Sequence, residues 1–130
     1  MALQAFPDPE AFINSAIDRG AREGLDALEP LQQTVFLISE VEVSSDMGGI
    51  DAFVDAYGPT GLRRASEAFL AVGATEIAAA LVAMARGLPG VDEKLWNRAN
   101  ALTTARTGYN FDAIAACVQA RLANASAASP

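Results

Sequence analysis

The chain has 130 residues, of which 52% are hydrophobic and 19% charged, and it contains no histidine and a single cysteine. This composition is typical of one folded domain with its own core, with an expected radius of gyration of about 14 Å. The formal net charge of −7 argues against direct binding to nucleic acid or to an anionic membrane, because neutralising phosphates requires clustered lysine and arginine.

Asp8 is followed by Pro9. A proline fits the first position of a helix, because its missing N–H would have no partner within the helix there. The first predicted helix therefore starts after Asp8. Gly24 can end this helix. A second segment opens at Pro30, and residues 41–44 within it alternate in the manner of a strand. We nevertheless expect a helix, because no second strand offers a partner. The apolar positions of the two segments repeat at helical spacing: Phe12, Ile13, Ala16 and Ile17, then Leu31, Val35, Ile38 and Val41.

Residues 47–49 predict a turn, followed by a short helix that ends at Gly58 and Pro59. The next helix is expected from about Thr60 to Val72, with Gly73 as its stop. In the short helix, four residues are expected to face inward: Ile50, Phe53, Val54 and Tyr57.

The last three predicted helices are capped by Thr75, Asp92 and Asn110, and residues 87–90 separate the first two of them. Each carries an apolar stripe, formed by Ile77, Ala80, Leu81 and Met84, by Leu95, Trp96, Ala99 and Leu102, and by Phe111, Ile114, Ala115, Val118 and Leu122.

These elements predict an all-α protein, a single compact domain of six or seven short helices over residues 1–124, with a frayed tail over 125–130. No apolar run approaches the ~20 residues that span a bilayer, and the first residues lack the pattern of a signal peptide. A lone Cys117 cannot form an internal disulfide. We therefore expect a cytoplasmic protein with no membrane partner.

The absence of histidine excludes a Ser-His-Asp or Cys-His relay and any zinc site that contains histidine. Cys117 lies between Ala116 and Val118, which favours a packed thiol over a nucleophile. We expect no enzymatic activity, no cofactor and no bound metal. The alternative is a metal-dependent protein, since clustered carboxylates can hold Mg²⁺ or Ca²⁺, and the best set is Glu42, Asp46, Asp51 and Asp55.

Residues 23–62, called here the base-free segment, hold eight carboxylates and no lysine or arginine. Residues 1–65 contain eleven acids and four bases, whereas residues 66–130 contain five of each, so the whole net charge lies in one half. The simplest interpretation is a solvated surface. The more specific hypothesis is a binding surface for a basic protein. A surface that carries only negative charge attracts a positively charged partner and speeds their association. The expected contacts are Glu40, Glu42, Asp46, Asp51 and Asp55.

Two stretches resemble a bacterial family of small acidic domains whose best-known member is a DNA-mimic protein. Residues 48–54, Gly-Gly-Ile-Asp-Ala-Phe-Val, resemble its Gly-Gly-Phe-x-Gln-Phe-Phe signature. Residues 65–81 resemble its alanine-rich helix, the glycine stop and the start of the next helix. Met47 stands where the family usually has Asn, and Ala52 replaces its Gln.

The resemblance implies an all-helical bacterial domain, often dimeric, whose acidic face imitates duplex phosphates and occupies a DNA-binding protein. Duplex DNA carries one charge per about 1.7 Å of axis, so eight acids correspond to roughly 14 Å. Because half-sites of a helix-turn-helix dimer lie about 34 Å apart, mimicry predicts a homodimer. Two alternatives remain, an immunity-type inhibitor of a basic toxin or nuclease, and a structural subunit that assembles through Trp96 and Tyr109.

Overall fold

In the computed structural model, which describes residues 8–128, helix α1 (Pro9–Glu23) starts and ends where the sequence predicts. The Asp8 carboxylate accepts a hydrogen bond from the backbone N–H of Glu10 at 3.1 Å. Gly24 ends the helix with a φ of 91°, a left-handed value that glycine adopts at little cost. A one-turn 3₁₀ helix, η2 (Leu25–Ala27), leads to the next element.

Helix α2 (Pro30–Asp46) is the central element of the fold. The expectation of a helix rather than a strand over residues 41–44 is confirmed. At its start, the backbone N–H of Glu29 donates to the Gln32 side chain at 2.9 Å, which satisfies one of the free groups at the helix end. Its buried residues are Val35, Phe36, Leu37, Ile38, Val41 and Ser45.

Helix α3 (Asp51–Ala71) consists of two helical segments joined at a kink. Gly58 has φ 66° and ψ −167°, which is not helical, and Pro59 follows it. The sequence predicts two helices separated at this point. The structure confirms the break and shows that the second segment continues directly from the first, because glycine followed by proline bends the chain within a single residue.

Helices α4 (Thr75–Gly87), α5 (Glu93–Thr104) and α6 (Phe111–Ala128) complete the chain. The predicted caps of the last two are confirmed. The Asp92 side chain accepts from the N–H of Lys94 at 2.8 Å, and the Asn110 side chain accepts from that of Ala113 at 2.9 Å. These three helices and the preceding ones confirm the all-α fold over residues 8–128.

Two sequence predictions about these helices are wrong. Thr75 does not cap α4, because the capping position is Ala74, which is fully buried. Thr75 is the first helical residue and so lies one position past the cap, and the loop after α5 packs on Ala74, since a Cβ at Gly108 would lie 3.3 Å from the Ala74 Cα. Phe111 is half exposed rather than inward, because α6 reaches the core through Ile114 and Val118 instead.

The helical backbone of α6 extends to Ala128, and the expectation that residues 125–130 fray stays a prediction. Residues 129–130 lie outside the described part of the chain, as do residues 1–7. No helix in the described range is long and apolar enough to cross a membrane.

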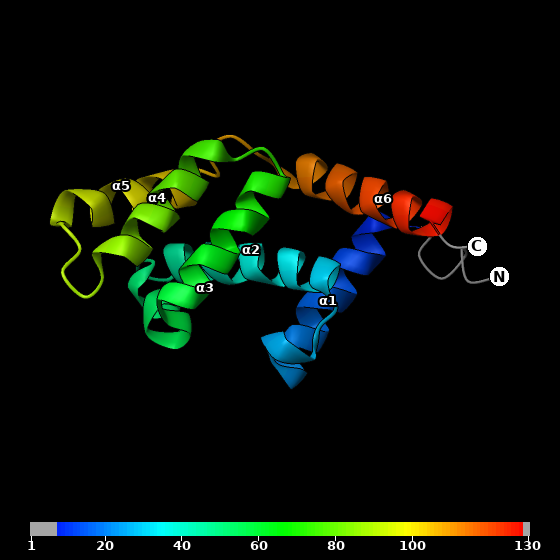
Figure 1. Cartoon of the computed structure of the whole chain (residues 1–130), viewed down its shortest axis with the longest axis horizontal. Coiled ribbons are helices and arrows are strands. Elements are labelled where there is room, and N and C mark those ends of the chain that lie inside the picture. Colours follow the sequence, from blue (N-terminus) through cyan, green and yellow to red (C-terminus); the bar gives the residue numbers. More distant parts are fainter. Residues whose placement is uncertain (1–7, 129–130) are drawn as a thin grey trace.

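The helices pack around α2 and α3, as Figure 1 shows. Helix α3 contacts α2 on one side and α4 on the other, and α5 lies against α4. At the far end of the molecule, α6 packs against α1. A buried pair of hydroxyls, Ser45 and Thr103, 2.6 Å apart, ties the end of α2 to α5. The largest fully buried side chains are Phe53, Phe69, Ile38, Ile50, Leu62, Ile77, Leu81 and Met84.

Candidate acidic interface

The second half of α2 carries three of the five predicted contact residues, and it directs them to different neighbours. Val41 is fully buried, and the helix turns by about 100° per residue, so Glu40 and Glu42 flank Val41 on opposite sides of the helix. The Glu40 carboxylate accepts a hydrogen bond of 2.9 Å from the Tyr57 hydroxyl on α3. Glu42 instead faces the loop that follows α5.

That loop contributes Arg106, which binds the end of α2. Its guanidinium donates two hydrogen bonds to the Asp46 carboxylate, both 2.8 Å long, and its Nε lies 3.4 Å from the Glu42 carboxylate. The Tyr109 hydroxyl donates to the same Glu42 carboxylate. Arg106 has a φ of 53°, a left-handed conformation that disfavours residues with a side chain. Side-chain contacts therefore hold a strained backbone in place here.

These contacts shift the proton affinities of the groups involved. The hydrogen bonds from Arg106 hold the pKa of Asp46 below its ordinary value of 3.8. Burial, followed by the hydrogen bond to Glu42, raises the pKa of Tyr109 far above its ordinary value. Burial and the bond to Glu40 raise the pKa of Tyr57 to about 12. Both phenols therefore stay protonated at neutral pH and act as donors to the two glutamates.

The remaining two predicted contact residues, Asp51 and Asp55, are exposed on the first turns of α3. Four residues apart on a helix, they share one face. The start of α3 is fixed by Asn100 of α5, whose side-chain oxygen accepts from the N–H of Ile50 at 2.7 Å. Asn100 was missed by the sequence interpretation, because nothing in the local sequence connects it to a turn 50 residues away.

Half of the eight carboxylates in the base-free segment are paired with arginine. Ion pairs join Glu23 to Arg19, Asp26 to Arg64, and Glu42 and Asp46 to Arg106. Over residues 8–128, the other four carboxylates form no ion pair: Glu29, Glu40, Asp51 and Asp55. The local charge is therefore lower than the sequence count indicates, and three of the five predicted contacts remain unneutralised.

The carboxylate set considered for a metal is not gathered at one point. Within the described residues, no group of three or more histidine, cysteine, aspartate or glutamate side chains is placed to hold a metal ion. Two members of the set, Glu42 and Asp46, already bind Arg106.

Comparison with known families agrees with the resemblance of residues 48–54 and 65–81. A family model described as DMP19-like protein matches residues 26–119, from η2 to the middle of α6. The chain belongs to the DMP19-like family. The suspected membership of a family of DNA-mimic type is thereby confirmed. No curated protein and no solved structure matches the chain.

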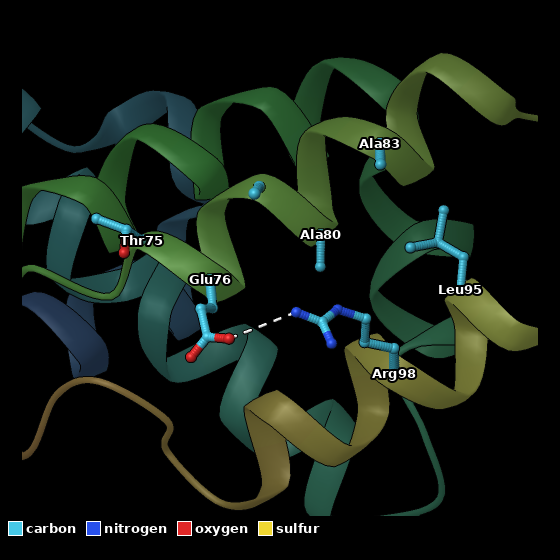
Figure 2. A pocket seen from close by; sticks show the side chains of 7 residues that line it. Thr75, Glu76, Ala80, Ala83, Leu95 and Arg98 are labelled. Atoms are coloured by element: carbon cyan, nitrogen blue, oxygen red, sulfur yellow. Dashed lines mark hydrogen bonds and ion pairs between the residues drawn. The ribbon is translucent and has the colours of Figure 1, made fainter.

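The surface of this DMP19-like domain is also hollowed between α4 and α5, where alanine side chains leave a space of about 320 Å³ (Figure 2). Arg98 reaches across one end of it to Glu76, at 3.4 Å. Both of these side chains are about 60% exposed, so their ion pair contributes little to stability. The walls are Thr75, Ala79, Ala80, Ala83 and Leu95.

Proposed function

We propose that this protein is a non-catalytic binding protein that occupies a basic, DNA-binding protein by presenting carboxylates where DNA presents phosphates. Membership of the DMP19-like family is the observation that carries the proposal. The charge distribution supports it, because the net charge of −7 arises entirely within residues 1–65. The proposal requires no cofactor and no metal.

The centre of the proposed surface is the pair Asp51 and Asp55, with Glu40 on the neighbouring helix. Within the part of the chain that the structure describes, these three carboxylates have no arginine partner, and Asp51 and Asp55 are exposed. Glu42 and Asp46 form its edge, where Arg106 compensates part of their charge. A partner's lysine and arginine side chains would thus meet the start of α3 first.

The four unpaired carboxylates of the base-free segment correspond to about 7 Å of duplex, at one charge per about 1.7 Å. One copy therefore imitates a short run of phosphates rather than a whole operator. A homodimer in the bacterial cytoplasm is part of the proposal, because two copies would offer two such runs to a two-fold symmetric partner.

The test is capture of the partner on the immobilised full chain from a lysate of the source organism, followed by elution with duplex DNA. We expect a basic DNA-binding protein that is released by rising salt and also by duplex DNA at constant salt, because the two ligands compete for one surface. An uncharged polymer of equal mass is the control. A captured protein that duplex DNA does not displace would contradict mimicry and favour the immunity-type alternative.

A further inference from the structure

A second hollow, of about 220 Å³, lies between α2, α3 and α6 and differs in character from the rest of this acidic protein. Two arginines line it, Arg64 from α3 and Arg121 from α6, together with a single carboxylate, Glu67. The lining side chains carry two positive charges and one negative charge, and Asp26, the ion-pair partner of Arg64, adds a second carboxylate beside them. The rest of its wall is formed by Pro30, Gln33, Thr34, Leu37 and Ala68.

Arg64 is held in place by Gln33. The amide nitrogen of Gln33 donates to the backbone carbonyls of Leu25 and Leu28, each at 3.2 Å. These two bonds fix which end of the amide is oxygen, and that oxygen accepts from the Arg64 guanidinium at 3.0 Å. The other contact of Arg64 is with Asp26, at 3.5 Å from a carboxylate whose side chain is 95% exposed, which is a weak restraint.

Arg121, an exposed residue of α6, lines the same hollow with all its donors available. It makes no hydrogen bond or ion pair with any residue in the described part of the chain. A guanidinium has five N–H donors in a planar fork that matches a carboxylate. One guanidinium is thus oriented by a fixed amide, and a second one without a partner lines the same small space.

We propose that this hollow binds a small monocarboxylate, held by Arg64 and Arg121. The carboxylates of Glu67 and Asp26 offset part of the positive charge, so they repel a singly charged carboxylate less than a doubly charged phosphate. The side chains of Pro30, Leu37 and Ala68 offer an apolar wall for a short hydrocarbon chain. The site does not include the acidic interface, and the proposal holds whether or not the protein is a DNA mimic.

The test is titration of the full chain with butyrate, followed by backbone amide NMR signals. We expect saturable shifts centred on residues around Gln33, Arg64 and Arg121. Butyramide, which has the same shape without the charge, should give none, and inorganic phosphate should bind more weakly. Absence of saturable shifts with butyrate, equal binding of butyramide, or tighter binding of phosphate would each overturn the proposal.

Substitution separates the site from general charge effects. Arg121→Gln removes a guanidinium that has no partner among residues 8–128, and it should weaken butyrate binding about tenfold, as expected for loss of one charged hydrogen-bonding group. Arg63→Gln is the matched control, because Arg63 is exposed on α3 and does not line the hollow. Equal affinity of the Arg121→Gln and Arg63→Gln variants would also overturn the proposal.

Discussion

Arg106 and Asp46 are 60 residues apart in the sequence and are joined by two hydrogen bonds of 2.8 Å. Such a bidentate contact is the strongest geometry that a guanidinium and a carboxylate adopt. It ties the loop between α5 and α6 to the end of α2. It also places a positive charge against one edge of the proposed acidic interface.

The first prediction concerns stability in acid. Because Arg106 lowers the pKa of Asp46 below 3.8, the unfolded chain binds this proton more readily than the folded one. The stabilisation is present above about pH 3.8 and is lost as the pH falls through the lower pKa of the folded state. Arg106→Gln should therefore reduce the free energy of unfolding at neutral pH, and the difference from wild type should shrink below pH 3.8.

Urea denaturation at a series of pH values measures this effect. Arg63→Gln removes an exposed arginine that forms no ion pair with the described residues, and it should show no such pH-dependent difference. If the difference in the free energy of unfolding between wild type and Arg106→Gln stayed constant from neutral pH to below pH 3.8, Arg106 would stabilise the protein through packing rather than through its charge.

The second prediction separates the side chain of Arg106 from its backbone. Arg106→Ala and Arg106→Gly both remove the guanidinium, but alanine keeps the steric cost of a φ of 53° and glycine does not. The glycine variant should be more stable than the alanine variant by about 1 kcal/mol. Thermal and chemical denaturation of the two variants side by side would show it. An alanine variant that equals or exceeds the glycine variant would mean that the backbone is relaxed there.

The Arg106 contact also shows where prediction from sequence stops. The carboxylates of the base-free segment are evident in the sequence, but which of them are neutralised depends on arginines that lie outside it. Arg64 and Arg106 reach Asp26, Glu42 and Asp46 through tertiary packing, and spacing along the chain carries no information about such pairs. The sequence therefore predicts the total charge correctly and overestimates how much of it is free.

The third prediction concerns stability in alkali. The pKa of Tyr57 is raised from 10.0 to about 12 by burial and by Glu40, so the unfolded chain loses the phenolic proton first as the pH rises. The free energy of unfolding should fall between pH 10 and 12. The free energy of unfolding of the Tyr57→Phe variant should fall less steeply in this range, because phenylalanine has no phenolic proton to lose.

Absorbance titration of tyrosinate gives an independent check with the Tyr57 ring in place. Glu40→Gln removes the acceptor's charge and should move the Tyr57 midpoint back toward 10.0, though not fully, because burial is the larger cause. An unchanged midpoint in this variant would show that Glu40 does not influence the phenol.

The fourth prediction concerns the contact of α1 with α2. A Cβ at Gly20 would lie 2.3 Å from the Phe36 ring, closer than any relaxed contact. Gly20→Ala should therefore destabilise the fold by about 1–3 kcal/mol, as overpacked sites do, although alanine favours helix. Gly90→Ala is the control, since its Cβ would meet nothing closer than a carbonyl oxygen at 3.8 Å. Comparable stability of the two variants in urea would show that Phe36 moves aside freely.

Most helix boundaries were predictable because their signals are local. Asp8, Asp92 and Asn110 lie within three residues of the amides that they cap, and Gly24 and Gly73 have the positive φ values that helix ends require. The cap predicted at Thr75 was wrong because this residue, although its side chain can cap a helix, lies one position after the buried Ala74 that occupies the capping position. Phe111 was predicted to face inward and is half exposed. Helical periodicity indicates the apolar face of α6 but not the turn at which its contact with the core begins.

We infer that Asp51 and Asp55 contact the basic partner. The most direct measurement is the affinity of the captured partner for the Asp51→Asn/Asp55→Asn variant and for Glu93→Gln/Asp112→Asn. Both variants remove two exposed carboxylates near helix starts, so their net charges are equal. We predict at least a tenfold loss of affinity, and a shallower dependence of affinity on salt, for the first variant and near wild-type behaviour for the second. Equal weakening of both variants, or of neither, would show that Asp51 and Asp55 do not form the contact.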